Sequence, residues 1–203
     1  MHVTKIKQIG VFDTVRVQHK TYDVEEHLFR TRFGAKIPQY NQLRKMFSTD
    51  PENLRILATT LKFVIYLANG DILFYEFFPG FIWDFASIVK LFRSILDNDD
   101  IELMPGAIIH DRNFSVHVMS FTDTNDLFYE MIKHQINYPW NNKRMRRIRL
   151  KAWIAYNAVS SMFGKFFWRK RAIKRLEYTL QFSRFTRIPF GTSSKFAIEN
   201  FLK

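Results

Sequence analysis

Two runs of β-forming residues on either side of an Asn-Gly pair constrain the fold more than any other feature. Residues 61–67 and 72–78 are rich in β-branched and aromatic side chains, and Asn69-Gly70 lies between them. Apolar runs flanking Asn-Gly predict a β-hairpin closed by a type I′ turn. Pro79-Gly80 follows directly and is expected to end the second strand.

Most of the remaining segments have apolar residues at helical spacing. The segments predicted to be helical are residues 41–47, 51–61, 85–96, 105–114, 124–136 and 143–178. Gly164 is the expected break in the last of these. Residues 15–18 alternate briefly, as a strand does, whereas residues 185–203 are expected to form a loop or tail with a short terminal helix.

These patterns predict an α+β fold, in which a β-hairpin or small antiparallel sheet packs against a mainly helical C-terminal part. A chain of 203 residues is long enough to bury one sizeable core. We therefore expect a main domain at residues 61–180. An extension at residues 1–60 is expected to pack on this domain, and a tail is expected at residues 181–203.

The composition excludes several classes of protein. The chain has no cysteine, which excludes a disulfide scaffold, a thiolate metal site and a cysteine nucleophile. Its 22 Phe, 8 Tyr and 4 Trp exclude an intrinsically disordered chain. No apolar run reaches the roughly 18 residues of a transmembrane helix. Residues 1–16 also lack the apolar run of a signal peptide, so secretion by a signal peptide is not expected.

His110 and Asp111, adjacent on a predicted helix, are the residues best suited to chemistry. A neutral imidazole can act as a general base near neutral pH. The Asp111 carboxylate points roughly 100° away around the helix and could bind a cation. Asp126 on the next predicted helix could bond the other ring nitrogen of His110 and fix its tautomer. The same residues also fit a His-Asp pair that only caps or bridges helices.

Asp84 and Ser87 are candidate supporting residues for this site. Asp84 is a good N-cap for the predicted helix at residues 85–96, and Ser87 falls in the first turn of that helix. Capping alone explains the two residues as well as a functional role does.

Four segments occur in order at residues 80–88, 107–114, 125–128 and 156–164. Together they resemble a family of phage and prophage proteins classed as domain of unknown function 1353. The family pattern runs G-[FY]-x-[TW]-D-[FL]-A-S-[IV]-P, then A-A-x-x-H-D-x-x-[YF], then A-D-x-x-F, then Y-x-A-V-x-x-x-G. This chain supplies the corresponding residues at 80–88, 107–114, 125–128 and 156–164. It departs from the usual pattern with Val89 for Pro, Phe114 for Tyr and Asn125 for Ala. The resemblance implies a phage setting, often among tail or late genes, but no particular reaction.

The H-D-x-x-[YF] element is also similar to the core of secreted and parvoviral phospholipases A2. In those enzymes a His activates water, the next Asp binds calcium and a later Asp orients the His. That resemblance implies His110 as the base, Asp111 as the ligand of a calcium cofactor and Asp126 as the orienting acid. No glycine-rich calcium loop precedes His110, and Phe114 lacks the tyrosine hydroxyl.

All of the excess positive charge lies in the C-terminal third. Between Lys143 and Arg187 there are 14 Lys or Arg and one acid, against 17 bases and 18 acids elsewhere. Such a patch favours a phosphate-rich or acidic partner. The residues expected to form this basic surface are Arg144, Arg146, Arg147, Arg149, Arg169, Lys170 and Arg171. The uncharged residues 152–164 between the basic runs fit either a core helix that docks on the hairpin or a helix at a membrane interface.

Three functions therefore follow from the sequence and its resemblances. The first is a phage-encoded virion or tail-associated structural protein whose basic surface docks on acidic partners, including other phage structural proteins. The second is a calcium-dependent phospholipase A2-like hydrolase that uses His110, Asp111 and Asp126 at an anionic membrane surface. The third is a nucleic-acid-binding phage protein. In each case we expect the chain in the virion or in the host cytoplasm.

Overall fold

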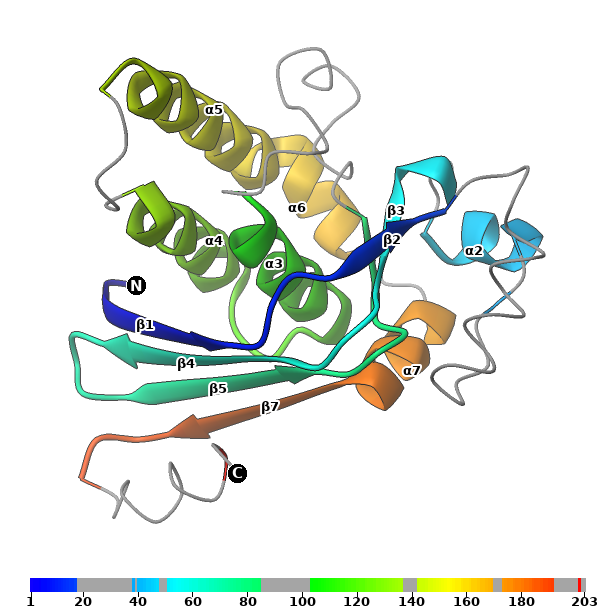
Figure 1. The fold of residues 1–203 in the computed structure, drawn as a ribbon, viewed down its shortest axis with the longest axis horizontal. Coiled ribbons are helices and arrows are strands. Elements are labelled where there is room, and N and C mark those ends of the chain that lie inside the picture. The colour runs from blue at the N-terminus through cyan, green and yellow to red at the C-terminus, as the bar shows by residue number, and fades with distance from the viewer. Residues whose placement is uncertain are drawn as a thin grey trace.

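Two antiparallel sheets and a set of helices make up the fold (Figure 1). The computed structural model describes residues 1–17, 38, 40–47, 51–84, 103–136, 142–169, 173–191 and 201. The strands are β1 (Val3–Ile9), β2 (Thr14–Arg16), β3 (Leu54–Leu57), β4 (Leu61–Leu67), β5 (Ile72–Phe77), β6 (Ile82–Asp84) and β7 (Ser183–Ile188). The helices are α2 (Tyr40–Phe47), the 3-10 helix η1 (Pro51–Asn53), α3 (Met104–Val116), α4 (Phe121–Ile136), α5 (Asn142–Ser160), α6 (Met162–Arg169) and α7 (Ile173–Phe182).

The larger sheet has four strands in the order β1-β4-β5-β7, and the smaller has three in the order β2-β3-β6. All neighbouring strands are antiparallel. Helices α3 and α4 cover one face of the larger sheet, and α5 lies across them on the far side from that sheet (Figure 1). The predicted α+β fold is therefore confirmed.

The predicted hairpin is present as β4 and β5, with Tyr66 opposite Ile72 at its closed end. Its turn is not type I′, because that turn needs a positive φ at both central residues. Gly70 has a φ of +87°, but Asn69 has no positive φ. Instead, Gly70 N donates to Leu67 O and Leu67 N donates to Asp71 O, each at 2.9 Å. Residues 68–71 thus form a longer connection with Gly70 in the left-handed conformation.

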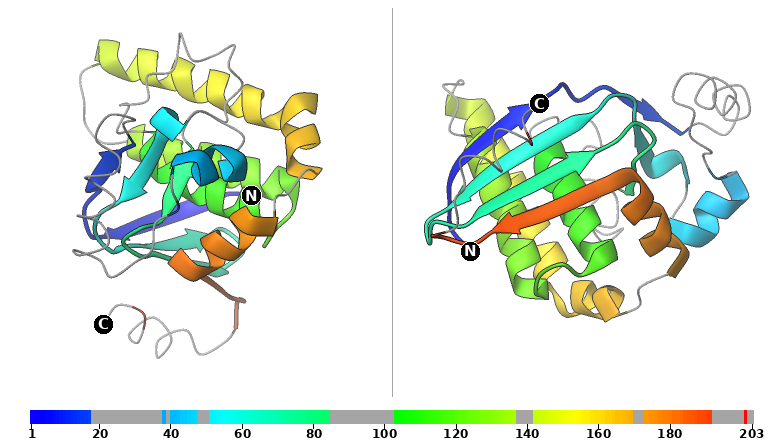
Figure 2. Two further views of the ribbon diagram at one scale, coloured as in Figure 1. Left: turned by 90° about the vertical axis from the view of Figure 1, so that its right-hand side faces the viewer. Right: turned by 90° about the horizontal axis from the view of Figure 1, so that it is seen from below.

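Alternation along β4 and β5 separates two apolar layers. Phe63, Tyr75 and Phe77 point into the main core beneath α3 and α4. Val64 and Phe74 point to the opposite face of the sheet, where they form a second, smaller cluster. The right-hand view of Figure 2 shows this face in front, with the helices behind the sheet.

Helix α3 is the innermost helix, and a glycine sets its distance from α4. All residues from Met104 to Asn113 are buried. A Cβ at Gly106 would lie 2.9 Å from the Phe128 carbonyl oxygen and 3.1 Å from Ile132 Cγ1, both on α4. Gly106 therefore permits the close packing of α3 against α4.

Two segments differ from the sequence prediction because tertiary pairing overrides local pattern. The helix predicted at residues 51–61 is wrong: only η1 is helical, and β3 follows, paired with β2 and β6. The loop or tail predicted from residue 185 is also wrong at its start. That part of the chain belongs to β7, which pairs along β5 and buries Ile188.

The long helix predicted at residues 143–178 is divided into α5, α6 and α7. The first break lies at Ser161, three residues before the predicted position. Gly164 is helical, and a Cβ there would collide with the Val159 carbonyl at the end of α5. This glycine therefore permits the tight junction between α5 and α6. The helix predicted at residues 85–96 lies outside the described residues.

Both ends of the chain contribute to the larger sheet. β1, from the predicted extension at residues 1–60, pairs with β4. β7, from the predicted tail at residues 181–203, pairs with β5. The hairpin predicted as the β-part of the fold is thus the centre of a sheet completed by strands distant in sequence.

Candidate functional site

Four successive polar residues of α3 are buried in the core. His110, Asp111, Arg112 and Asn113 are between 0% and 6% exposed. Buried polar groups destabilise a protein unless they are hydrogen-bonded or paired. The partners of these side chains therefore show what the predicted His-Asp site does.

The His110 ring lies between α3 and α4. Its Nε2 donates to Asn125 Oδ1 at 3.0 Å. The ring centroids of Phe114 and Phe128 are 5.5 and 5.3 Å away. With Nε2 bonded to an amide oxygen, Nδ1 is the acceptor nitrogen of the neutral imidazole. Nδ1 lies 3.7 Å from Asp111 Oδ1, which is too far for a hydrogen bond.

Asp126 does not face His110, which corrects the predicted orienting contact. Asp126 Oδ2 lies 3.0 Å from the Met1 amine, and its Oδ1 accepts from the Tyr156 hydroxyl at 3.1 Å. Neighbouring residues on a helix point roughly 100° apart. The rotation of α4 therefore presents Asn125, not Asp126, to His110.

Asp111 joins three elements of the fold. Its Oδ2 accepts from the backbone N of Asp84 in β6 at 2.5 Å and lies 3.5 Å from Arg175 Nη2 of α7. The Arg175 guanidinium also lies 4.7 Å from the ring centroid of Phe47 in α2. Asp111 was predicted to be a calcium ligand, but these contacts engage its carboxylate within the core. The described residues contain no group of three or more His, Asp or Glu that could hold a metal ion.

The two supporting candidates are only partly visible in the structure. Asp84 is 3% exposed and ends β6, where its backbone N bonds Asp111. Ser87 and the helix that Asp84 was predicted to cap lie outside the described residues.

Arg112 and Asn113 converge on Tyr75 of β5. The Arg112 guanidinium lies 5.7 Å from the Tyr75 ring centroid and 5.2 Å from that of Phe185. Asn113 Nδ2 donates to the Tyr75 hydroxyl at 2.9 Å. Burial lowers the pKa of Arg112 to about 10 and raises the pKa of Tyr75. These contacts attach α3 to the sheet.

The described network holds helices and strands together and has the character of a structural core. A general base must reach the proton that it removes. His110 is 6% exposed and is enclosed by Asn125 and two phenylalanine rings. Within the described residues, the His110 ring forms a buried hydrogen bond between two helices.

Comparison with known families identifies the central part of the chain. Residues 68–159 match the model of a family described as a protein of unknown function (DUF1353). This part of the chain belongs to the DUF1353 family. The match bears out the predicted family but gives no evidence for the phospholipase A2 resemblance. No curated protein and no solved structure matches the chain.

The DUF1353 region contains β5, β6, α3 and α4, and it ends within α5. It holds His110, Asp111 and Asn125, whereas Arg175 reaches Asp111 from α7, beyond the region. Sequence reasoning missed both Asn125 and Arg175 as partners. Asn125 had one visible signal, because it departs from the usual alanine of the DUF1353 pattern. Arg175 had none, since only the fold brings α7 against α3.

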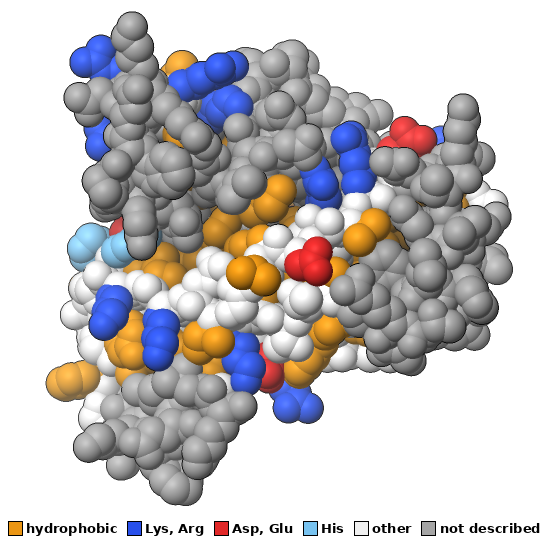
Figure 3. Space-filling view, viewed as in Figure 1, with side chains coloured by type: hydrophobic (Ala, Val, Ile, Leu, Met, Phe, Trp, Pro, Cys, Tyr) orange, Lys and Arg blue, Asp and Glu red, His pale blue; other side chains and the backbone are white. Residues whose placement is uncertain are grey.

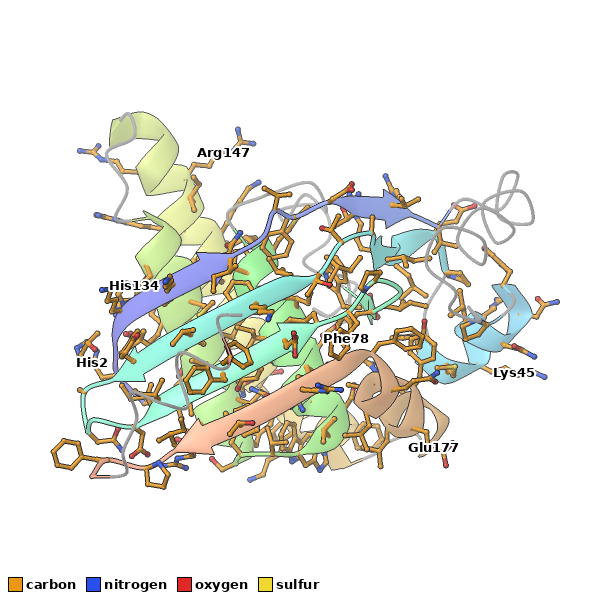
Figure 4. The ribbon with its side chains drawn as sticks, turned by 60° about the horizontal axis from the view of Figure 1, so that its bottom comes forward. His2, Lys45, Phe78, His134, Arg147 and Glu177 are labelled. Atoms are coloured by element: carbon orange, nitrogen blue, oxygen red, sulfur yellow. The ribbon has the colours of Figure 1, made fainter. Side chains whose placement is uncertain are left out.

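At the end of the DUF1353 region, α5 exposes the second candidate site. We name this the α5 surface: Arg146, Arg147, Arg149, Leu150 and Trp153. The three arginines are exposed, and Leu150 and Trp153 are each 56% exposed. Figure 4 shows Arg147 pointing away from the body of the protein, and Figure 3 shows Lys and Arg side chains gathered at this end.

The opposite side of α5 is buried through Ile148, Ala152 and Ala155. α5 packs on α4 rather than on the hairpin, so the predicted docking of this helix on the hairpin is corrected. Among the described helices, none is long and apolar enough to cross a membrane. Of the other predicted basic residues, Arg144 lies in the first turn of α5 and Arg169 ends α6, but their side chains lie outside the described part. Lys170 and Arg171 lie outside it entirely.

Proposed function

We propose that this chain is a structural protein of a phage particle, associated with the virion or its tail, that docks on an acidic protein through the α5 surface. The observation that carries the proposal is the combination of three exposed arginines with exposed Leu150 and Trp153 on one helix. The phage setting rests on the family resemblance. The acidic partner follows from charge complementarity.

The apolar residues of the α5 surface favour a protein as its partner. Arg and Trp are enriched among the residues that dominate protein–protein binding, where an apolar centre is surrounded by charge. Trp153 follows Arg149 and Leu150 by about one helical turn, so the three share one side of α5. Phosphate contacts alone would not require exposed Leu150 and Trp153 beside the arginines.

The phospholipase alternative has less support than the docking function. That mechanism needs an acid that orients the base and a free carboxylate for calcium. Asn125 takes the position at His110 that Asp126 was predicted to take, and Asp111 bonds the Asp84 backbone and pairs with Arg175. Nothing in the described network favours nucleic acid over protein at the α5 surface.

Charge reversal in the phage tests the proposal. The variant Arg146→Glu/Arg147→Glu changes the α5 surface. The matched variant Arg44→Glu/Lys45→Glu makes the same change in charge on exposed residues of α2, at another part of the molecule (Figure 4). Mass spectrometry of purified particles would count the copies of the chain per particle for the wild type and for each variant.

We expect particles to retain the wild-type chain and the α2 variant. The number of copies of the α5 variant per particle should fall by at least about tenfold, which corresponds to the loss of about 1.4 kcal/mol of docking free energy. Absence of the wild-type chain from particles would refute the structural role. Equal incorporation of both variants would refute docking through α5.

A further inference from the structure

The face of the larger sheet that points away from the helices carries a separate apolar patch. Its buried members are Val64, Ile72, Phe74 and Ile188, and they are not part of the main core. This face is seen in Figure 2 (right) and Figure 4. Soluble proteins rarely leave contiguous apolar patches of this kind uncovered unless the patch binds something.

One aromatic side chain of the same chain is seated on this patch. The Phe201 ring centroid lies 4.6 Å from that of Phe74, with the rings tilted by 56°. Phe201 is partly buried, and it packs against the patch together with Tyr66. The patch therefore fits an aromatic ring.

Lys62 of β4 contacts both the ring and the backbone of Phe201. Its Nζ donates to the Phe201 carbonyl oxygen at 3.0 Å and lies 5.3 Å from the centre of the ring. Glu76, on the neighbouring strand, lies 3.2 Å from the same ammonium group and holds it in place. A cation positioned in this way favours a segment that presents an aromatic ring and a carbonyl oxygen together.

We propose that Lys62, Val64, Phe74 and Ile188 form a binding site for a peptide segment that carries a phenylalanine, and that Phe201 occupies this site in cis. We name it the Phe201 site. The main core is complete without Phe201, so the residue can leave without opening the helical side of the fold. A segment on the same chain has a high effective concentration and competes with any external peptide.

A peptide of residues 198–203, labelled at its N-terminus, probes the site directly because Phe201 is its only aromatic residue. It is titrated into the full-length chain carrying Phe201→Ala, and into the wild type. Phe190→Ala is the matched control, because it removes the same side chain from a position that is 79% exposed. A second peptide has alanine in place of Phe201.

We expect saturable binding to the Phe201→Ala chain, and binding at least about tenfold weaker to the wild type and to Phe190→Ala, in which Phe201 still fills the site. Lys62→Met in the Phe201→Ala background should weaken binding by about three- to tenfold, since it removes the donor and the cation. The alanine peptide should not bind.

Three results would overturn the proposal. The first is no saturable binding to the Phe201→Ala chain. The second is that the peptide binds the wild type as tightly as it binds the Phe201→Ala chain, or that the alanine peptide binds as tightly as the original peptide. The third is unfolding of the Phe201→Ala chain by circular dichroism, because Phe201 would then be a core residue and not an exchangeable ligand.

Discussion

His110 Nε2 and Asn125 Oδ1 lie 3.0 Å apart in the buried contact between α3 and α4. An amide oxygen fixes the imidazole tautomer as a carboxylate would, but it carries no charge to stabilise an imidazolium. The pair therefore joins the two helices by a buried hydrogen bond. Asp111, next to His110, instead connects α3 to β6 and α7.

Asn125→Ala should lower the free energy of unfolding by about 1–3 kcal/mol, because it leaves the buried Nε2–H of His110 without an acceptor. Urea unfolding measures the change. Asn157→Ala, on the exposed side of α5, is the control and should stay within about 0.5 kcal/mol of the wild type. Equal effects of the two substitutions on the free energy of unfolding would show that the His110–Asn125 hydrogen bond does not stabilise the fold.

Asp111→Ala should cost about 3–5 kcal/mol of unfolding free energy, since it leaves the Arg175 guanidinium without its buried partner. Glu177→Gln, at an exposed position of the same helix α7, should have little effect. In a double-mutant cycle, adding Arg175→Met to Asp111→Ala should cost less than the two single changes summed. Strict additivity would mean that the two side chains do not stabilise one another.

Glu130 should make the stability depend on pH. Burial raises its pKa, but hydrogen bonds from Lys133 and from the Val3 backbone outweigh burial, so the pKa lies below its ordinary 4.5. A carboxyl with a lowered pKa stabilises the fold above its unfolded pKa, and this stabilisation is lost as pH falls through the folded pKa. Glu130→Gln should thus reduce stability at neutral pH, and the difference should vanish in acid. A difference that is constant with pH would contradict this.

Gly106→Ala should destabilise the protein, although alanine is favoured over glycine in a helix by about 1 kcal/mol. The added methyl would meet the Phe128 carbonyl at 2.9 Å and force α3 away from α4, at a cost of about 1–3 kcal/mol. The change in melting temperature on thermal unfolding shows whether the substitution stabilises or destabilises the protein. A higher melting temperature would show that the two helices can separate freely.

Local patterns were sufficient where neighbouring residues decide the structure. The hairpin at residues 61–78 and the helices α3 and α4 could be predicted because their β-forming runs and helical spacing lie within one segment. β3 and β7 could not be predicted, because each exists through pairing with strands that are distant in sequence. The type of the hairpin turn was also set by the fold rather than by Asn69-Gly70.

In the candidate sites, too, some features follow from the local sequence and others depend on how the chain packs. The sequence placed His110 and Asp111 on one helix and the positive charge in the C-terminal third, and both placements hold. It could not tell whether Asn125 or Asp126 faces His110, because the rotation of α4 depends on its packing. Nor could charge alone show that Leu150 and Trp153 are exposed beside the arginines of α5.

Photo-crosslinking within assembled particles tests directly whether the chain docks through the α5 surface. A photoreactive amino acid replaces Trp153, with Lys45 of α2 as the control position. We expect one adduct to an acidic structural protein from the Trp153 position, and we expect it to be lost in the Arg146→Glu/Arg147→Glu background. The Lys45 position should give no such adduct. An adduct to nucleic acid or lipid, or incorporation into particles with no adduct at Trp153, would contradict it.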